Sequence, residues 1–266
     1  MNKKIKALFF DIDGTLVSFQ THEIPASTIE AIEKAKANGI KVYISTGRPR
    51  AIITNLGAIE HLIDGYISTN GAYCFVEDKE VCCHAIPSED VQKVIEQADK
   101  QHFACVVVGT HRLCIYQENE KFDRIFLKML KVKGFEKAVS LDEVLEEPIL
   151  QLSPFIDPEQ EEELMSMLTG CLSGRWHPEF TDITSLAADK GQGLQAMVKH
   201  LGLDIEETMA FGDGGNDVSI IQQAGVGVAM ANAVPELKEV ADYITTSVDD
   251  DGIKKALEYY GVIETH

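Results

Sequence analysis

Residues 5–16 read IKALFFDIDGTL, an apolar run that ends in two closely spaced acids. The run predicts a buried strand over Ile5 to Phe10. Side chains two apart on an extended chain point the same way, so Asp11 and Asp13 share one side just beyond the strand. Ligands of open α/β sheets bind at that carboxyl edge. Two carboxylates this close repel each other unless a cation holds them or one keeps its proton, so the pair indicates a functional site.

The turn allows two other interpretations, a solvated acidic turn and a calcium-binding loop. A solvated acidic turn would need no apolar strand leading directly into it. A calcium-binding EF-hand loop would need a third Asp or Asn before its glycine. Here Gly14 follows Asp13 at once.

The next residues repeat the alternation of helix and strand. Residues 27–38 have isoleucines at helical spacing and are followed by Gly39, a helix stop signal. Residues 40–45 and 63–68 predict two further strands, and Pro49 suits the first turn of a helix between them. This order predicts a Rossmann-like parallel sheet with helices on both faces.

The pattern changes after about residue 73. A hairpin is predicted at 73–85, a helix at 88–101 with Ser88 as its cap, and further strands beside one another up to residue 184. The strand–helix alternation then returns. We therefore predict an α/β catalytic core from residues 1–83 and 186–266, split by an inserted α+β cap domain at 84–185 that selects the substrate.

Three further motifs carry groups suited to an oxyanion or a metal. Residues 44–48 read ISTGR and end the second strand, and residues 189–191 read DKG at a helix start, where backbone donors favour anions. Residues 211–217 read FGDGGND at another strand end. Taken alone, each motif could also be a plain turn or a solvated charge. For residues 211–217 this is the weaker interpretation, because a turn that only needs glycines does not need two acids and an Asn.

Taken together, the four motifs resemble those of the haloacid dehalogenase superfamily. DxDGTL, a strand-ending S/T-G-R, a lone Lys and GDxxND occur here in the family's order, and the resemblance covers the whole chain. The large α+β insertion resembles that of the Cof-type phosphatases, which act on phosphorylated metabolites. The resemblance implies a magnesium-dependent phosphatase of small phosphorylated metabolites, with sugar phosphates as the expected class.

The resemblance also implies a role for each site residue. Asp11 would be the nucleophile that forms an aspartyl-phosphate, and Asp13 would be the general acid and base. Mg²⁺ would be held by Asp11, the backbone carbonyl of Asp13, and Asp213. Asn216 and Asp217 would orient that shell, and Asp217 is counted with the metal-site residues. These oxygen ligands suit magnesium.

The same resemblance assigns the substrate-binding residues, which are Thr46, Gly47, Arg48, Lys190 and Asn216. Thr46 and Lys190 would hold the phosphoryl oxygens. A phosphomutase on the same scaffold is the nearest alternative, and a non-catalytic binding or regulatory protein is a further one. The retention of every catalytic carboxylate weighs against the latter.

Within the predicted cap, residues 174–179 read GRWHPE and hold the only Trp in the chain. Arg175, Trp176 and His177 form a mixture suited to a hydroxyl-rich ligand. The alternative is that they belong to the core of the cap. The sequence therefore leaves open whether these residues contact the leaving group or belong to the core of the cap.

Composition limits the partners. Acidic residues outnumber basic ones by 43 to 24, for a formal charge of −19, which disfavours nucleic acid and anionic lipid as partners. An anionic substrate would then need a local positive site.

No apolar run approaches the length of a membrane span and the start lacks a signal-peptide pattern, so we expect a cytoplasmic protein. The six cysteines lack zinc-site spacing and are expected to be mostly buried thiols.

Overall fold

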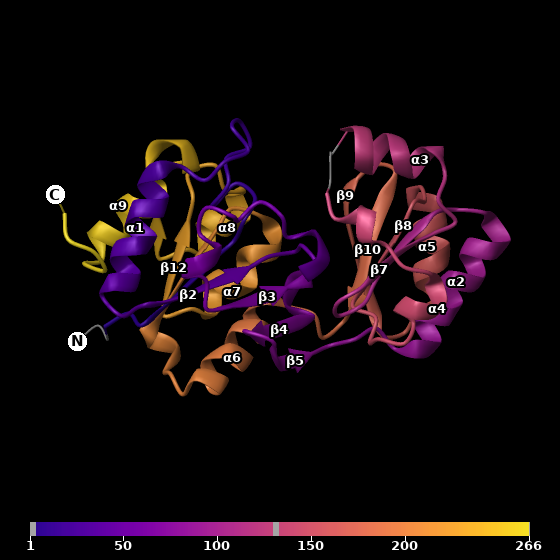
Figure 1. The fold of residues 1–266 in the computed structure, drawn as a ribbon, viewed down its shortest axis with the longest axis horizontal. Helices are drawn as coiled ribbons and strands as arrows, with labels where there is room; N and C mark the ends of the chain where they lie inside the picture. Colours follow the sequence, from indigo (N-terminus) through magenta and orange to yellow (C-terminus); the bar gives the residue numbers. More distant parts are fainter. Residues whose placement is uncertain (1–3, 130–132, 266) are drawn as a thin grey trace. The chain divides into compact units, whose positions relative to one another are not determined.

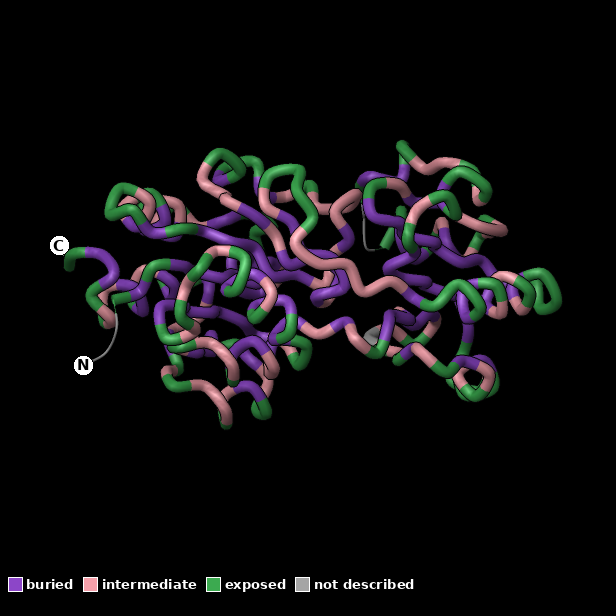
Figure 2. Tube along the Cα trace, turned by 90° about the horizontal axis from the view of Figure 1, so that it is seen from below, coloured by how far each residue is buried: buried purple, intermediate pink, exposed green. Residues whose placement is uncertain are grey.

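The chain folds into two compact units, each with its own β-sheet (Figure 1). The computed structural model describes residues 4–129 and 133–265. Within these, the first unit comprises residues 4–47, 55–82 and 189–265, and the second comprises residues 48–54 and 83–188. Figure 2 colours the chain trace by burial, and buried stretches alternate with exposed ones along both units.

An eight-stranded sheet forms the centre of the first unit, in the order β13-β12-β11-β1-β2-β3-β4-β5. The pairs from β13 to β3 are parallel, and β4 runs antiparallel to β3. The strands are β1 (Ala7–Phe10), β2 (Lys41–Ser45), β3 (Gly65–Ser68), β4 (Tyr73–Val76), β5 (Lys79–Cys83), β11 (Thr208–Gly212), β12 (Val226–Ala229) and β13 (Tyr243–Ile244).

Helices cover this sheet because its central strands are apolar on both faces. Every residue of β1 is buried. Ala7 and Phe9 point to one face and pack with apolar side chains of α6 (Lys190–Leu201), α7 (Val218–Gln223) and α8 (Pro235–Val240). Helices α1 (Ala26–Ala37) and α9 (Gly252–Tyr259) pack against each other (Figure 1). The predicted Rossmann-like core is confirmed.

The second unit is built on a five-stranded sheet in which every recorded strand pair is antiparallel. Its order is β7 (Leu113–Tyr116), β6 (Cys105–Val108), β8 (Gln151–Pro154), β10 (Phe180–Ser185) and β9 (Cys171–His177). Its helices are α2 (Ser88–Gln101), α3 (Glu120–Phe122), which continues as a π-helix over Asp123–Met129, α4 (Leu141–Val144) and α5 (Pro158–Met167). Sheet and helices are segregated, as expected of an α+β insertion.

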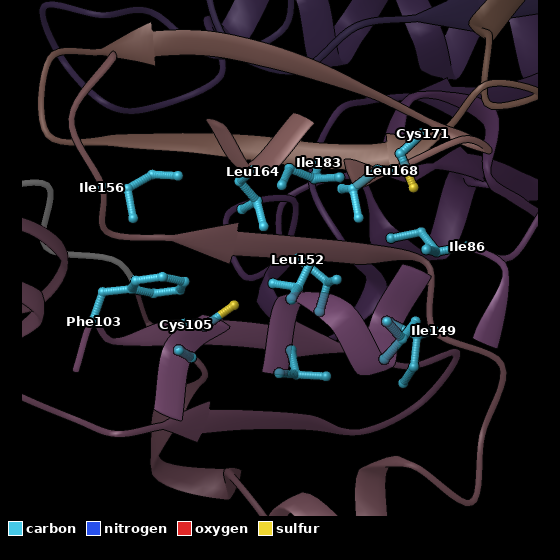
Figure 3. Packing of buried hydrophobic residues seen from close by; sticks show 14 of the residues in the cluster. Ile86, Phe103, Cys105, Ile149, Leu152, Ile156, Leu164, Leu168, Cys171 and Ile183 are labelled. Carbon is cyan, nitrogen blue, oxygen red and sulfur yellow. The ribbon is translucent and has the colours of Figure 1, made fainter. Parts of the chain in front are cut away.

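Two apolar clusters lie on opposite faces of this second sheet. The first contains Leu152 and Ile183 from the sheet and Leu164 from α5, so α2, α4 and α5 lie on this face (Figure 3), whereas α3 and the π-helix pack on the other. The second contains Val106 and Phe180 from the sheet, because neighbouring residues of a strand alternate between faces.

The second cluster also explains an unexpected grouping in the chain. Ala51 and Ile52 pack against it, and residues 48–54 therefore belong to the second unit, whereas the sequence places them in the core. The helix expected after Pro49 is also wrong, because the structure has a single 3₁₀ turn at Arg50–Ile52. Two of the residues in this turn face a core instead of continuing a helix.

The start of α2 differs from the prediction as well. Ser88 is the first helical residue and Pro87 occupies the N-cap position, with no side-chain cap. The helix is instead anchored by Asp90, whose Oδ2 accepts hydrogen bonds from the backbone N–H groups of Thr169 (3.1 Å) and Gly170 (2.8 Å). Its Oδ1 accepts one from Lys93 Nζ (2.9 Å). These bonds fix α2 to the segment that follows α5.

We expect Asp90→Asn to destabilise the second unit by about 1–3 kcal/mol, since two buried backbone donors lose their charged acceptor. Burial alone would raise the pKa of Asp90, but the bonds from Lys93, Gly170 and Thr169 outweigh it and lower the pKa below 3.8. The stabilisation is therefore present above the ordinary pKa and is lost as the pH falls through the lowered one.

Urea unfolding at neutral pH and near pH 3.5 measures this effect, with the exposed Asp142→Asn as control. The difference in the free energy of unfolding between the Asp90 variant and the parent should be smaller at the lower pH. Equal stability of the two proteins at neutral pH would contradict the assigned role.

No helix in the described part of the chain is long and apolar enough to cross a membrane. Cysteines 74, 105, 114 and 171 are buried thiols, and cysteines 82 and 83 are half-buried.

Candidate active site

The chemistry-bearing residues follow the carboxyl ends of three adjacent parallel strands. Phe10 of β1 pairs with Phe211 of β11 and with Ile44 of β2, so the residues after these strands meet at one edge of the sheet (Figure 1). The backbone N–H of Asp11 continues the ladder by donating to the carbonyl of Phe211 (3.0 Å). The sequence motifs at the three strand ends therefore form one site.

Lys190 ties the three strand ends together. It is the first residue of α6 and its side chain is completely buried. Its Nζ donates to Asp11 Oδ1 (2.7 Å), to Asp217 Oδ1 (2.5 Å) and to the backbone carbonyl of Ser45 (3.0 Å). The ammonium group thus has three acceptors in fixed positions, which compensates for its removal from water.

Asp213 and Asp217 are held by different partners. Asp213 follows β11, and its Oδ1 accepts a hydrogen bond from Thr15 Oγ1 (2.9 Å). Asp217 folds back as the next helix begins, and its Oδ2 accepts from the backbone N–H groups of Asp213 (3.1 Å) and Gly214 (3.0 Å). Asp217 is completely buried and binds both Lys190 and the backbone N–H of Asp213, so its position favours orienting these two residues.

The turn after β1 needs glycine at position 14. Gly14 has φ of +88°, and a Cβ there would collide with Oδ2 of Asp213. That oxygen also accepts from Asn232 Nδ2 (3.2 Å), which donates to the carbonyl of Gly14 as well (2.9 Å). The loops after β1 and β11 can therefore approach each other closely only because glycine has no side chain at position 14.

Negative charge in this site exceeds positive charge. The carboxylates of Asp11, Asp213 and Asp217 have oxygens within 4.8 Å of one another. Burial raises the pKa of Asp11 from 3.8 to about 8, and Asp217 and Asp213 add to the rise against the effect of Lys190. Burial also raises the pKa of Asp213 to about 6, with Asp217 and Asp13 adding to it.

A divalent cation fits this donor set. When all three carboxylates are ionised, they and the one ammonium leave an excess of two negative charges among these four groups, which a divalent cation would balance. The available ligand atoms are oxygens, and magnesium is bound in proteins by one or two carboxylates. Asp11 and Asp213 are the candidates to coordinate it. Asp13 is not in this carboxylate group, and its expected metal contact through the backbone carbonyl remains a prediction.

Asp13 lies beside this group, within electrostatic reach of Asp213. It is half-buried, whereas Asp11 is buried. A short bridge to Val17 fixes the backbone of the turn, and the N–H of Val17 donates to the carbonyl of Ile12 (2.8 Å). Its greater exposure suits a group that exchanges protons with solvent.

Thr46, Gly47 and Asn216 are grouped around Asn70, a residue that the sequence reasoning missed. The backbone N–H of Asn70 donates to the carbonyl of Thr46 (3.0 Å), and Asn70 Oδ1 accepts from Asn216 Nδ2 (2.9 Å). A Cβ at Gly47 would lie 3.0 Å from Asn70 Oδ1. Arg48 belongs to the second unit, where its Nη1 donates to the carbonyl of Ile52 (3.4 Å).

Thr15 and Asn232 were also missed. Thr15 is part of the DxDGT motif, so its hydroxyl was a visible signal. Asn70 and Asn232 each lie shortly after a parallel strand, and a polar residue at that place is the signal that could have found them.

Comparison with known proteins agrees with this geometry. The family model of haloacid dehalogenase-like hydrolases matches residues 8–257. The structure of the subclass IIB sugar phosphatase BT4131 superposes with a TM-score of 0.85 and is 46% identical, covering 97% of this chain and all (100%) of that one. YkrA of Bacillus subtilis (strain 168) is 32% identical over 260 residues, covering 97% of this chain and 99% of YkrA.

A third relative has a more specific name. The 5-amino-6-(5-phospho-D-ribitylamino)uracil phosphatase YcsE of Bacillus subtilis (strain 168) is 28% identical over 264 residues, 96% of each chain. The four motifs, the split α/β core and these matches agree. The chain belongs to the haloacid dehalogenase-like hydrolases, and it is a phosphatase of the Cof-type subfamily.

Proposed function

We propose that this phosphatase is magnesium-dependent and transfers the phosphoryl group of its substrate to Asp11 before releasing phosphate. The observation that carries the proposal is the position of Asp11. It lies at the carboxyl edge of the sheet, beside a buried lysine, with two further buried carboxylates within 4.8 Å. A carboxylate in that place can attack phosphorus without needing a base to activate it.

The first step forms one bond and breaks another. A carboxylate oxygen of Asp11 bonds to phosphorus as the bond from phosphorus to the leaving oxygen breaks, and Asp13 gives its proton to that oxygen. In the second step a water attacks the aspartyl-phosphate, Asp13 takes the proton of the water, and the Asp11 carboxylate is released. Asp13 therefore ends in the protonation state in which it began.

The other residues of the site position charge. Lys190 stays protonated, because Asp11 and Asp217 raise its pKa against the effect of burial. Mg²⁺, held by Asp11, Asp213 and the backbone carbonyl of Asp13, would neutralise the phosphoryl oxygens. We infer that Thr46 and Gly47 bind the phosphoryl group, with Asn216 and Arg48 completing the substrate site. Phosphoryl transfer depends chiefly on such positioning and charge neutralisation.

We expect removal of magnesium by a chelator to lower phosphate release on the order of 10²-fold or more, because the charge on the transferred group is no longer balanced. Re-added Mg²⁺ should restore activity. Ca²⁺ should inhibit, since its looser and larger coordination shell misplaces the nucleophile.

Thermal unfolding gives a second readout that does not depend on turnover. Mg²⁺ binds the folded site and relieves the repulsion of Asp11 and Asp213, so the unfolding midpoint should rise with the logarithm of the Mg²⁺ concentration once that exceeds the dissociation constant. Full activity in excess chelator, after exhaustive dialysis, would rule out the magnesium requirement.

We infer that the substrate is a phosphorylated sugar or polyol, and that residues of the second unit select it. Two relatives support this class, since one is named a sugar phosphatase and the other acts on a phosphorylated ribityl chain. A panel of phosphorylated metabolites, scored for phosphate release in the presence of magnesium, tests it. Formation of an isomer instead of free phosphate would indicate a phosphomutase.

A further inference from the structure

Three polar side chains form a hydrogen-bonded cluster on the sheet of the second unit. Gln151 and Ser153 belong to β8, and Asp182 belongs to the neighbouring β10. Ser153 Oγ donates to Asp182 Oδ1 (2.6 Å). Gln151 Nε2 donates to the same Oδ1 (3.0 Å) and to Ser153 Oγ (3.0 Å). We call these three residues the sheet polar cluster.

The sheet polar cluster lies on the face opposite α2, α4 and α5, the face on which α3 and the π-helix also pack. Leu152 and Ile183, which alternate with its members along the two strands, pack in the cluster beneath α2 and α5. On β9 the same alternation holds, because Ser173 and Arg175 both bind Glu161 of α5. The residue between them, Gly174, therefore faces the same side as the sheet polar cluster.

Space lies above this part of the sheet. Gly174 pairs directly with Asp182, and a Cβ at Gly174 would meet no atom of the described side chains and backbone within 4 Å. Asp182 itself is half-buried, while Gln151 is 6% exposed. The sheet polar cluster therefore adjoins a region that a ligand can enter.

Gln151 carries an unsatisfied acceptor in this position. Its Oε1 is buried and has no hydrogen-bond partner among the described residues. Exchanging its amide oxygen and nitrogen would not help, since the oxygen would then face the Asp182 carboxylate. A buried acceptor without a donor is costly, so its presence indicates a group that the free protein lacks.

The missing group must donate a hydrogen bond. An amide oxygen beside a carboxylate repels phosphate and other anions and attracts hydroxyl or amino hydrogens. A sugar or polyol carries several hydroxyl donors, each of which also accepts. The sheet polar cluster is thus suited to the hydroxyl-bearing part of a substrate and unsuited to its phosphate.

We propose that Gln151 and Asp182 bind hydroxyl groups of the substrate's sugar or polyol moiety and so select it. This inference rests on the proposed function and replaces Arg175 as the expected contact. Arg175 is instead satisfied within the protein, because it bonds to Glu161 (2.5 Å) and to the backbone carbonyls of Ile156, His177 and Pro178. The side chain of Trp176 lies outside the described parts of the structure.

The test compares Gln151→Met and Asp182→Asn with the parent on glucose 6-phosphate and on p-nitrophenyl phosphate, which has no hydroxyl on its ring. Loss of a buried hydrogen bond should lower kcat/KM on the sugar phosphate about 5- to 150-fold. Hydrolysis of the aryl phosphate should change less than about twofold. Gln97→Met is the matched control, because Gln97 lies on α2, on the opposite face of the sheet.

The outcomes separate this proposal from the proposed function. Equal loss on both substrates, in step with a lower unfolding midpoint, would overturn the proposal and make the cluster part of the fold. An unchanged ratio of the two activities at unchanged stability would overturn it too. A parent enzyme inactive on both phosphates in magnesium would instead contradict the proposed function. Glucosamine 6-phosphate, which carries an amine in place of one hydroxyl, serves as a third substrate. If the variants lose activity on glucosamine 6-phosphate but not on glucose 6-phosphate, the ligand donates through an amine and the hydroxyl assignment is wrong.

Discussion

Replacing Asp11 with asparagine is expected to reduce phosphate release to background, a loss on the order of 10⁴-fold or more. The amide cannot form the bond to phosphorus that the carboxylate forms. It has nearly the same shape, so Lys190 keeps an acceptor 2.7 Å away and the site should stay assembled. Because one of three crowded carboxylates is removed, unfolding should require at least as much denaturant as in the parent.

Two measurements complete this test. Acid quenching of the parent with ³²P-labelled substrate should trap label on the protein as a hydroxylamine-sensitive acyl phosphate, and the Asp11 variant should trap none. Calorimetric titration should show that the variant still binds substrate. Asp78→Asn, in the exposed turn between β4 and β5, is the matched control. Residual turnover within tenfold of the parent would mean that another residue is the nucleophile.

Replacing Asp13 with asparagine is expected to lower phosphate release from an alkyl phosphate on the order of 10²–10⁴-fold, since the leaving oxygen no longer receives a proton. The loss should be smaller with p-nitrophenyl phosphate, whose leaving group needs little protonation. The second step also loses its base, so the acyl phosphate should accumulate on Asp11.

Rapid-quench kinetics on the two substrates distinguish these effects. The Asp13 variant should show a burst of p-nitrophenol followed by a slow steady rate. A loss of the same size on both substrates, without a burst, would show that Asp13 positions the site instead of transferring protons. Because Asp13 also acts on the pKa of Asp213, magnesium affinity should be measured alongside.

The acidic composition of the chain has a local counterpart in the site. The formal charge is −19, and the substrate is also an anion. The buried ammonium group of Lys190 and a bound divalent cation would reverse the sign of the potential at the point where the phosphoryl group binds. Selection of the organic part of the substrate is then left to hydrogen bonding with its hydroxyl groups, as proposed for Gln151 and Asp182.

Local sequence was sufficient to predict the architecture and the sheet edge at which the candidate site residues meet. An apolar run followed by acids marks a strand end at Asp11 and again at Asp213, and parallel strands bring their carboxyl ends to one edge. The start of α6 at Lys190 followed from the DKG motif. These predictions held because strand periodicity, helix signals and the order of elements are properties of short segments.

The tertiary structure alone determined which groups contact one another. Lys190 reaches Ser45, Asp11 and Asp217 across 145, 179 and 27 residues of sequence, and Asn232 reaches Gly14 across 218. No local pattern specifies such pairs. Arg175 shows the same limit, since whether it faces a ligand or α5 depends on which side of β9 it occupies. Packing against Glu161 settles that choice, because a half-buried arginine is most stable where a carboxylate and backbone carbonyls accept hydrogen bonds from its N–H groups.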